Sequence, residues 1–146
     1  MAKEIERKFL VIDNSYLPLA VQSYAIAQGY LCRDPERTVR VRISGEKAFL
    51  TIKGVSIGAE REEYEYEIPL SDGQRLLSLC VGRVIRKHRH IVPCGQHLWE
   101  VDQFEDSLAP LVVAEVELSS ADEEIELPAF VGEEVTGDPS YYNSNL

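Results

Sequence analysis

The chain is short of basic residues, cysteine and long apolar runs, and each shortage narrows what it can do. Lysine and arginine number 15 against 25 aspartates and glutamates, so the formal net charge is −10 at pH 7. This balance argues against nucleic acid and anionic membrane surfaces as general partners. The apolar runs are far too short to span a bilayer, and the charged amino terminus is unlike a secretory signal.

The three cysteines, Cys32, Cys80 and Cys94, are odd in number and form no close pair. We therefore expect reduced thiols in the cytoplasm rather than a disulfide framework. The three histidines lack zinc-ligand spacing with these cysteines, so we expect them on an outer face or in loops. With 146 residues, 45% of them hydrophobic, and no linker or internal repeat, the sequence predicts one domain over residues 1–146.

What the sequence does have is a series of strand-like segments with charges at alternate positions. In the first of them, Glu4, Glu6 and Lys8 project to one face of a strand, while Ile5 and Phe9 project to the other. The same alternation of charged with apolar or aromatic residues recurs over 38–43, 50–53, 63–68, 99–102 and 114–118. The segment around 86–90 is less regular, because its two faces both carry basic or histidine side chains.

For one isolated strand, this pattern usually means a solvated outer face over a packed inner face. Two features of the whole set favour another interpretation. Glutamate is a poor strand former, yet glutamate pairs recur at strand centres. Like charges two positions apart on one face lie roughly 6.5–7 Å from each other, where nothing in the sheet relieves their repulsion. These rows of charge need oppositely charged groups between them.

The polar faces carry more negative than positive side chains. The acidic members are Glu4, Glu6, Glu63, Glu65, Glu100, Asp102, Glu115 and Glu117, and the basic members are Lys8, Arg40, Arg42, Lys53, Lys87 and Arg89. If these faces converge, one or two divalent cations would make the lining neutral or positive, and it would accept a polyanion. Hard oxygen ligands suit Mg²⁺ or Mn²⁺ rather than Zn²⁺, and arginine and lysine suit phosphate oxygens.

Convergence of the charged faces requires a closed sheet. A barrel of about eight strands turns one face inward and removes the sheet edges. We therefore predict a mainly β member of the α+β class, an eight-stranded antiparallel closed barrel with a few short flanking helices. Capping-box spacing predicts helices over 71–81 and 120–128. Shorter helices are expected within 13–21 and at 141–143, and 54–58 is expected to be a hairpin loop.

The ordered set of motifs resembles the short bacterial members of the CYTH superfamily, the triphosphate tunnel metalloenzymes. The motifs are Glu4-x-Glu6-x-Lys8, 28–31, Val39-Arg40-Val41-Arg42, 51–54, Glu63-Tyr64-Glu65, Lys87 with Arg89, 99–102, 114–117 and 132–138. The resemblance implies metal ligands from Glu4, Glu6, Glu63, Glu65, Asp102, Glu115 and Glu117. It implies phosphate binding by Lys8, Arg40, Arg42, Lys53, Lys87 and Arg89, with Lys87 also orienting or activating the attacking water.

The function expected from this resemblance is hydrolysis of a triphosphate with Mg²⁺ or Mn²⁺, most simply inorganic tripolyphosphate to pyrophosphate and phosphate. Three alternatives stay open at this point. The first is thiamine triphosphatase or class IV adenylyl cyclase activity on an organic triphosphate. The second is polyphosphate binding without turnover. The third is an acidic β-protein whose charges are merely solvated. The expected partner is a small-molecule triphosphate, and an incompletely covered outer face would favour a homodimer.

Overall fold

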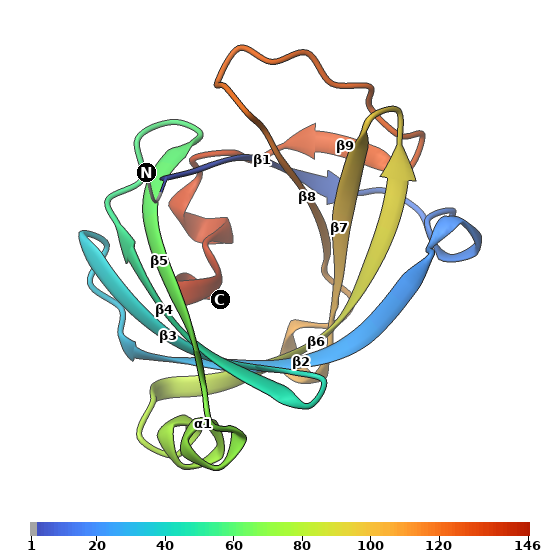
Figure 1. The fold of residues 1–146 in the computed structure, drawn as a ribbon. Coiled ribbons are helices and arrows are strands. Elements are labelled where there is room, and N and C mark those ends of the chain that lie inside the picture. The colour runs from blue at the N-terminus through green and yellow to red at the C-terminus, as the bar shows by residue number, and fades with distance from the viewer. Residues whose placement is uncertain (1–2) are drawn as a thin grey trace.

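The computed structural model describes residues 3–146, and their strands form a closed antiparallel ring (Figure 1). The eight strands of the ring are β1 (Lys3–Val11), β2 (Gln22–Cys32), β3 (Arg37–Ser44), β4 (Lys47–Gly54), β5 (Glu60–Ile68), β6 (Val81–Cys94), β7 (His97–Phe104) and β8 (Val112–Glu117). Their order is β5-β4-β3-β2-β6-β7-β8-β1, and pairing of β1 with β5 closes the ring. The predicted eight-stranded antiparallel barrel is confirmed.

The ring closes over a short seam between β1 and β5. Only residues 3–5 of β1 pair with β5, where Glu4 faces Arg61 in register. Farther along β1, Phe9 and Val11 pair instead with a short ninth strand, β9 (Val131–Glu134). No strand was predicted at these positions from the sequence. One edge of β1 is therefore shared by β5 and β9, and the chain after β9 enters the ring beside this seam (Figure 1).

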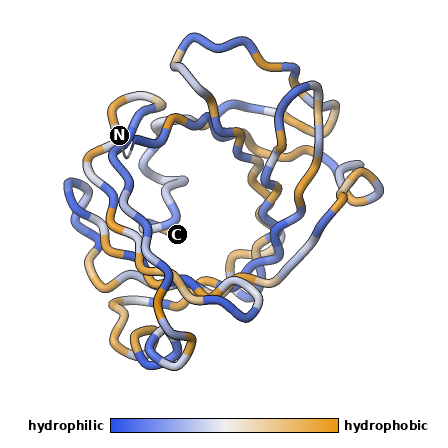
Figure 2. Tube along the Cα trace, in the orientation of Figure 1, coloured by the Kyte–Doolittle hydropathy of each residue, from blue (hydrophilic) through white to orange (hydrophobic). Residues whose placement is uncertain are grey.

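Charged and apolar residues alternate along the strands because the two faces of the ring meet different surroundings. Figure 2 shows hydrophilic and hydrophobic positions alternating around the ring. On the outer face, Trp99, Val101, Val116 and Phe9 belong to a buried apolar cluster. The inner face carries most of the charged side chains of the eight ring strands, so the usual arrangement of a small sheet is inverted as predicted.

The helix α1 (Leu70–Leu77) covers the outer face of β3 and β4. It begins one residue before Ser71, so the expected capping box does not cap it, and it ends before residue 81. Packing of the helix against the sheet explains where the helix begins. A Cβ atom on Gly73 would lie 2.5 Å from the Ala48 Cβ, so the helix must set its glycine on that alanine to reach the sheet. Contact with the sheet has overridden the local cap signal.

The predicted helix over 120–128 is wrong. The Glu123 carboxylate accepts a hydrogen bond at 2.6 Å from the N–H of Ser119, one residue before the expected cap, and no helix follows. The segment instead runs in irregular conformation over the outer face and places Phe130 against the cluster around Trp99. Phe130 is fully buried, so the burial of this side chain determines the path of the segment.

The remaining helical segments are single 3₁₀ turns: η1 (Leu17–Leu19), η2 (Asp106–Leu108), η3 (Pro139–Tyr141) and η4 (Asn143–Asn145). The first falls within the predicted range 13–21. The last two form the carboxyl-terminal segment, which lies inside the ring (Figure 1). In the part of the chain that the structure covers, no helix combines the length and apolar character needed to cross a membrane.

Part of the outer face stays bare beyond α1. On β4 and β5, Ile52, Tyr64 and Tyr66 are 37%, 42% and 57% exposed. Ile52 pairs with Tyr64 across the two strands, so these side chains form one apolar and aromatic strip. The sequence did not show which strands would be left uncovered, and the structure places exposed apolar side chains on these two.

Candidate functional site

The ring encloses a cavity of about 400 Å³. Five of the six predicted phosphate-binding cations line it: Lys8, Arg40, Arg42, Lys53 and Arg89. Six of the seven predicted metal-binding carboxylates also line it: Glu4, Glu6, Glu63, Glu65, Glu115 and Glu117. Glu100 lines the cavity as well, whereas Lys87 and Asp102 do not. The sequence pattern therefore identified the inward face, but two of the residues on it are buried and do not line the cavity.

The carboxylates gather where β1 lies beside β8. Glu6 pairs in register with Glu117, and Lys8 with Glu115. Burial and the charges of Glu115 and Glu4 raise the pKa of Glu6 well above its usual value. Burial together with its neighbour Glu63 raises the pKa of Glu4 to about 7. The raised pKa values mean that burial and the neighbouring carboxylates outweigh the positive charge of Lys53 at these two groups.

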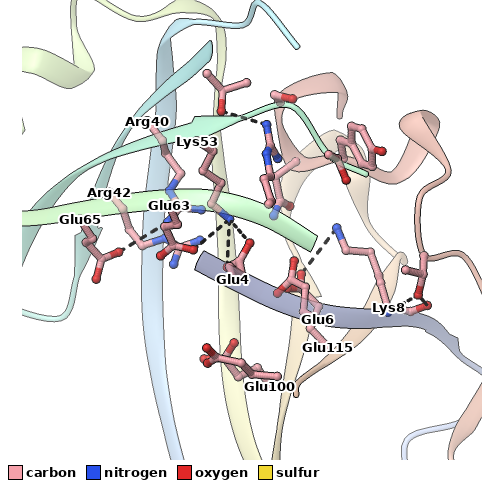
Figure 3. A pocket seen from close by; sticks show the side chains of 18 of the residues that line it. Glu4, Glu6, Lys8, Arg40, Arg42, Lys53, Glu63, Glu65, Glu100 and Glu115 are labelled. Carbon is pink, nitrogen blue, oxygen red and sulfur yellow. Dashed lines mark hydrogen bonds and ion pairs between the residues drawn. The ribbon is translucent and has the colours of Figure 1, made fainter. Parts of the chain in front are cut away.

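Two lysines partly balance this acidic cluster. The Lys53 ammonium donates to Glu4 Oε1 at 3.0 Å and lies 3.7 Å from Glu63 Oε2 (Figure 3). The Lys8 ammonium lies 3.6 Å from Glu115 Oε1, and it holds the pKa of that carboxyl well below its usual value although burial acts to raise it. Neither lysine is bonded to Glu6, which keeps oxygen atoms available for another cation.

The arginines gather on β3 and β6, across the ring from these carboxylates. Arg40 lies 3.8 Å from Glu65 Oε2, and its Nε atom has no partner among the described residues. Arg42 donates from Nε to the Gln28 side-chain oxygen at 2.8 Å. Burial, with the nearby charges of Arg40 and Arg89, lowers the pKa of Arg42 to about 9. The pKa still leaves this guanidinium charged at neutral pH, in surroundings that favour an anion.

Lys87 and Asp102 form a buried ion pair that does not line the cavity. The Lys87 ammonium donates to Asp102 Oδ2 at 2.6 Å, and both side chains are at most 1% exposed. Arg89 donates to both oxygens of the same carboxylate, at 2.8 and 2.9 Å. Burial and the charges of Arg89 and Arg42 lower the pKa of Lys87 to about 7 despite Asp102. Asp102 thus connects Lys87 to Arg89, which does reach the cavity.

The oxygen ligands of the acidic cluster suit a hard divalent cation, but the side chains are not arranged around one point as metal ligands would be. Within residues 3–146, no group of three or more Asp, Glu, His or Cys side chains has the arrangement needed to hold a metal ion. The donor set nevertheless consists of carboxylate oxygens, which Mg²⁺ and Mn²⁺ prefer. The raised pKa values of Glu4 and Glu6 also indicate that an added positive charge would stabilise the cluster.

Several residues of the cavity were missed by the sequence analysis. Arg61 lines it, donates to the Gly54 carbonyl at 2.6 Å, and lies with its guanidinium 6.0 Å from the Tyr142 ring centroid. The signal for Arg61 was present, because it shares the inward face of its strand with Glu63. Tyr142 carried no such signal, since only the folded structure shows that the carboxyl-terminal segment enters the ring.

The tunnel with opposed rows of carboxylates and basic side chains defines the class, and comparison with known proteins agrees. The chain belongs to the CYTH domain family, whose match covers residues 2–142. It is 44% identical over 147 residues to the inorganic triphosphatase of Acetivibrio thermocellus, covering 100% of this chain and 94% of that protein. It is 36% identical over 148 residues to the inorganic triphosphatase of Nitrosomonas europaea, covering 98% and 95%.

A solved structure agrees with these relatives. The crystal structure of the inorganic triphosphatase NE1496 superimposes with a TM-score of 0.69 at 33% identity, covering 97% of this chain and 95% of that chain. The resemblance to the CYTH superfamily expected from the sequence is confirmed.

Proposed function

We propose that this chain is a metal-dependent triphosphatase that hydrolyses inorganic tripolyphosphate to pyrophosphate and phosphate. The observation that carries the proposal is that one cavity holds both carboxylates and basic side chains. Glu4 and Glu6, the two carboxylates of β1, have raised pKa values, and the arginines lie on β3 and β6. A polyphosphate bound together with divalent metal satisfies both groups at once. The names of the full-length relatives, inorganic triphosphatase, support the same substrate class.

In this proposal, Mg²⁺ or Mn²⁺ is held by carboxylates drawn from Glu4, Glu6, Glu63, Glu65, Glu115 and Glu117. Bound metal would neutralise charge on the phosphates and lower the pKa of a water molecule. The chain itself supplies phosphate binding through Lys8, Arg40, Arg42, Lys53 and Arg89. Because phosphoryl transfer needs mainly positioning and charge stabilisation, such a cavity requires no covalent intermediate.

The two predicted site residues that do not line the cavity keep roles in the proposal. We assign Lys87 the role of orienting or activating the attacking water. We assign Asp102 the role of orienting Lys87 and Arg89 rather than binding metal directly. The support is the pair of hydrogen bonds by which Asp102 holds Arg89, at 2.8 and 2.9 Å, while it also accepts one from Lys87. A carboxylate with three donors has little capacity left for a metal ion.

An inorganic substrate is favoured over an organic one by the contents of the ring. The carboxyl-terminal segment contributes Tyr142, Asn143 and Ser144 to the cavity lining. The Lys8 ammonium donates to the Tyr141 carbonyl at 3.1 Å, and Leu146 packs against a second apolar cluster formed by Ile85, Phe104 and Val113. This segment occupies space beside the charged residues that a base or thiazole group would need.

We expect colorimetric phosphate release to be fastest with tripolyphosphate and to require Mg²⁺ or Mn²⁺, with EDTA abolishing it. ATP and thiamine triphosphate should be hydrolysed at least about tenfold more slowly, because the carboxyl-terminal segment lies where an organic group would extend from the bound phosphates. Equal rates on all three substrates would contradict the choice of substrate. Tight tripolyphosphate binding without phosphate release would instead identify a polyphosphate-binding protein.

Removal of residues 139–146 is expected to raise the rate on ATP relative to tripolyphosphate by about tenfold or more, since the segment excludes organic groups sterically. Tyr142→Ala is a milder change that removes the ring beside Arg61 and should act in the same direction. Tyr66→Ala on the exposed outer face is the matched control. The measurement is kcat/KM for both substrates in each variant. An unchanged ratio in both tail variants would show that the segment does not select the substrate.

Two further expectations from the sequence stay proposals. We place the protein in the cytoplasm, a proposal supported by three free cysteines. We also propose a homodimer, and the bare strip of Ile52, Tyr64 and Tyr66 is the outer surface that would favour it.

A further inference from the structure

Arg42 differs from the other five predicted phosphate-binding residues in having no acidic partner, and among the described residues of the cavity lining it shares this lack with Arg61. The other five each have a carboxylate within 4.0 Å: Lys8 has Glu115, Arg40 has Glu65, Lys53 has Glu4, and Lys87 and Arg89 share Asp102. Among residues 3–146, no aspartate or glutamate lies within that distance of Arg42. Arg42 nevertheless lines the cavity, so its charge is the least neutralised of the set.

The neutral side chain of Gln28 takes the place where a carboxylate partner would stand. Gln28 pairs in register with Arg42 across β2 and β3, so both side chains point to the inner face. Its side-chain oxygen accepts a hydrogen bond from Arg42 Nε at 2.8 Å. Gln28 is 0% exposed, and its Nε2 atom has no hydrogen-bond partner among the described residues. An acceptor without charge therefore orients the guanidinium while leaving its positive charge unpaired.

We infer that Gln28 is a positioning residue for the proposed triphosphatase activity, and that its neutrality is what keeps Arg42 available to the phosphate chain. A carboxylate at position 28 would accept the same hydrogen bond and would also pair with the guanidinium. It would then compete with the anionic substrate for Arg42. Since a phosphate oxygen gains more from an unpaired guanidinium than from one already in an ion pair, the competition weakens substrate binding.

The test compares Gln28→Glu with Gln28→Met. The glutamate variant keeps the acceptor and adds a charge, whereas the methionine variant loses the acceptor and adds none. We expect Gln28→Glu to raise KM for tripolyphosphate by about 10- to 100-fold, the range for hydrogen bonds to charged groups. Gln28→Met should raise KM several-fold less, and kcat should change less than KM in both. Gln74→Glu, the same change at an exposed position of α1, is the matched control and should leave KM unchanged.

A role in orientation alone predicts the opposite order, because glutamate retains the hydrogen bond and methionine does not. Gln28→Met being the more impaired variant would therefore overturn the inference, and so would equal KM values in Gln28→Glu and the unmodified protein. The melting temperature without ligand shows whether each variant folds.

The inference rests on the proposed function, so a second measurement separates the two. The rise in melting temperature with tripolyphosphate in EDTA reports anion binding without turnover. This rise should be smallest in Gln28→Glu. Absence of phosphate release by the unmodified protein, with the rise intact and reduced by Gln28→Glu, would reject the catalytic function and keep the role of Gln28. Turnover by the unmodified protein, with no effect of Gln28→Glu on KM or on the rise in melting temperature, would keep the catalytic function and reject the role of Gln28.

Discussion

Replacing Lys87 by methionine is expected to lower kcat for tripolyphosphate by about 10²- to 10⁴-fold, the range for loss of a group that assists proton transfer. Methionine preserves most of the side-chain volume above the Phe104 ring, whose centroid lies 5.2 Å from the ammonium. The Asp102 carboxylate does not become an isolated charge, because Arg89 still donates to both of its oxygens. The variant should therefore fold, and the loss of rate should greatly exceed any change in KM.

The pH profile tests the same residue in another way. Because the pKa of Lys87 is lowered to about 7, the free amine forms as pH rises through that value. Only the free amine can accept a proton from water, so the rate of the unmodified protein should rise with pH through about 7. Lys87→Met should lack this rise. Lys3→Met, at a lysine on the surface of β1 with a side chain 43% exposed, is the control.

Two other outcomes would change the assignment of Lys87. Turnover that is unchanged in Lys87→Met would remove the residue from the mechanism. A loss of rate without any rise near pH 7 in the unmodified protein would assign Lys87 to holding Asp102 and Arg89 in place, since this role does not depend on a free amine.

The closed barrel was predictable because alternation records which face of a strand each side chain occupies. Charges at every second position of β1, β3 and β5 require an enclosed polar interior, and that requirement implies closure. The alternation does not show how far along the tunnel each inward-facing side chain lies. Lys87 and Arg89 share a face of β6, yet only Arg89 reaches the cavity, because the position along the tunnel depends on strand tilt and on neighbouring strands.

The features that could not be predicted depend on contacts between distant segments. The cap signals near Ser71 and Ser120 are local, but packing of Gly73 on Ala48 and burial of Phe130 decided the two outcomes. The entry of the carboxyl-terminal segment into the ring is likewise set by distant groups, including the bond between the Lys8 ammonium and the Tyr141 carbonyl at 3.1 Å. Its sequence carries no periodicity that points to such a location.

The second prediction concerns Glu6 in the acidic cluster. Glu6→Gln should maintain or raise the melting temperature without metal, and should reduce the rise in melting temperature that metal causes. Glutamine resembles the protonated carboxyl and removes the repulsion from Glu4 and Glu115 that raises the pKa of Glu6. In EDTA at neutral pH, the melting temperature of the variant should therefore equal or exceed that of the unmodified protein, by up to about 2–4 °C. The variant also loses one anionic ligand for the metal. Its rise in melting temperature with Mg²⁺ or Mn²⁺ should be largely abolished.

Turnover should fall with the metal response, by at least about 100-fold, since changes one layer outside a metal's ligands already cost 10- to 100-fold. Glu62→Gln on the outer face of β5 is the matched control, because it removes a carboxylate that accepts from Tyr64 instead of lining the cavity. It should leave both the metal response and turnover intact. A Glu6→Gln variant with a full metal-linked rise would place the metal away from Glu6.

The pH dependence of the ligand-free protein follows from the same cluster. The folded pKa of Glu4 is about 7 and its usual value is 4.5, so protonation favours the folded state. The stabilisation is complete below about pH 4.5 and is lost as pH rises through about 7. Glu6, whose pKa is also raised, adds to this slope in the unmodified protein, whereas Glu6→Gln should show a shallower one. Because protons and metal compete for these carboxylates, metal-linked stabilisation should weaken as pH falls below 7. Melting curves across pH, with and without Mg²⁺, measure both effects, and a metal response independent of pH would contradict binding at these two glutamates.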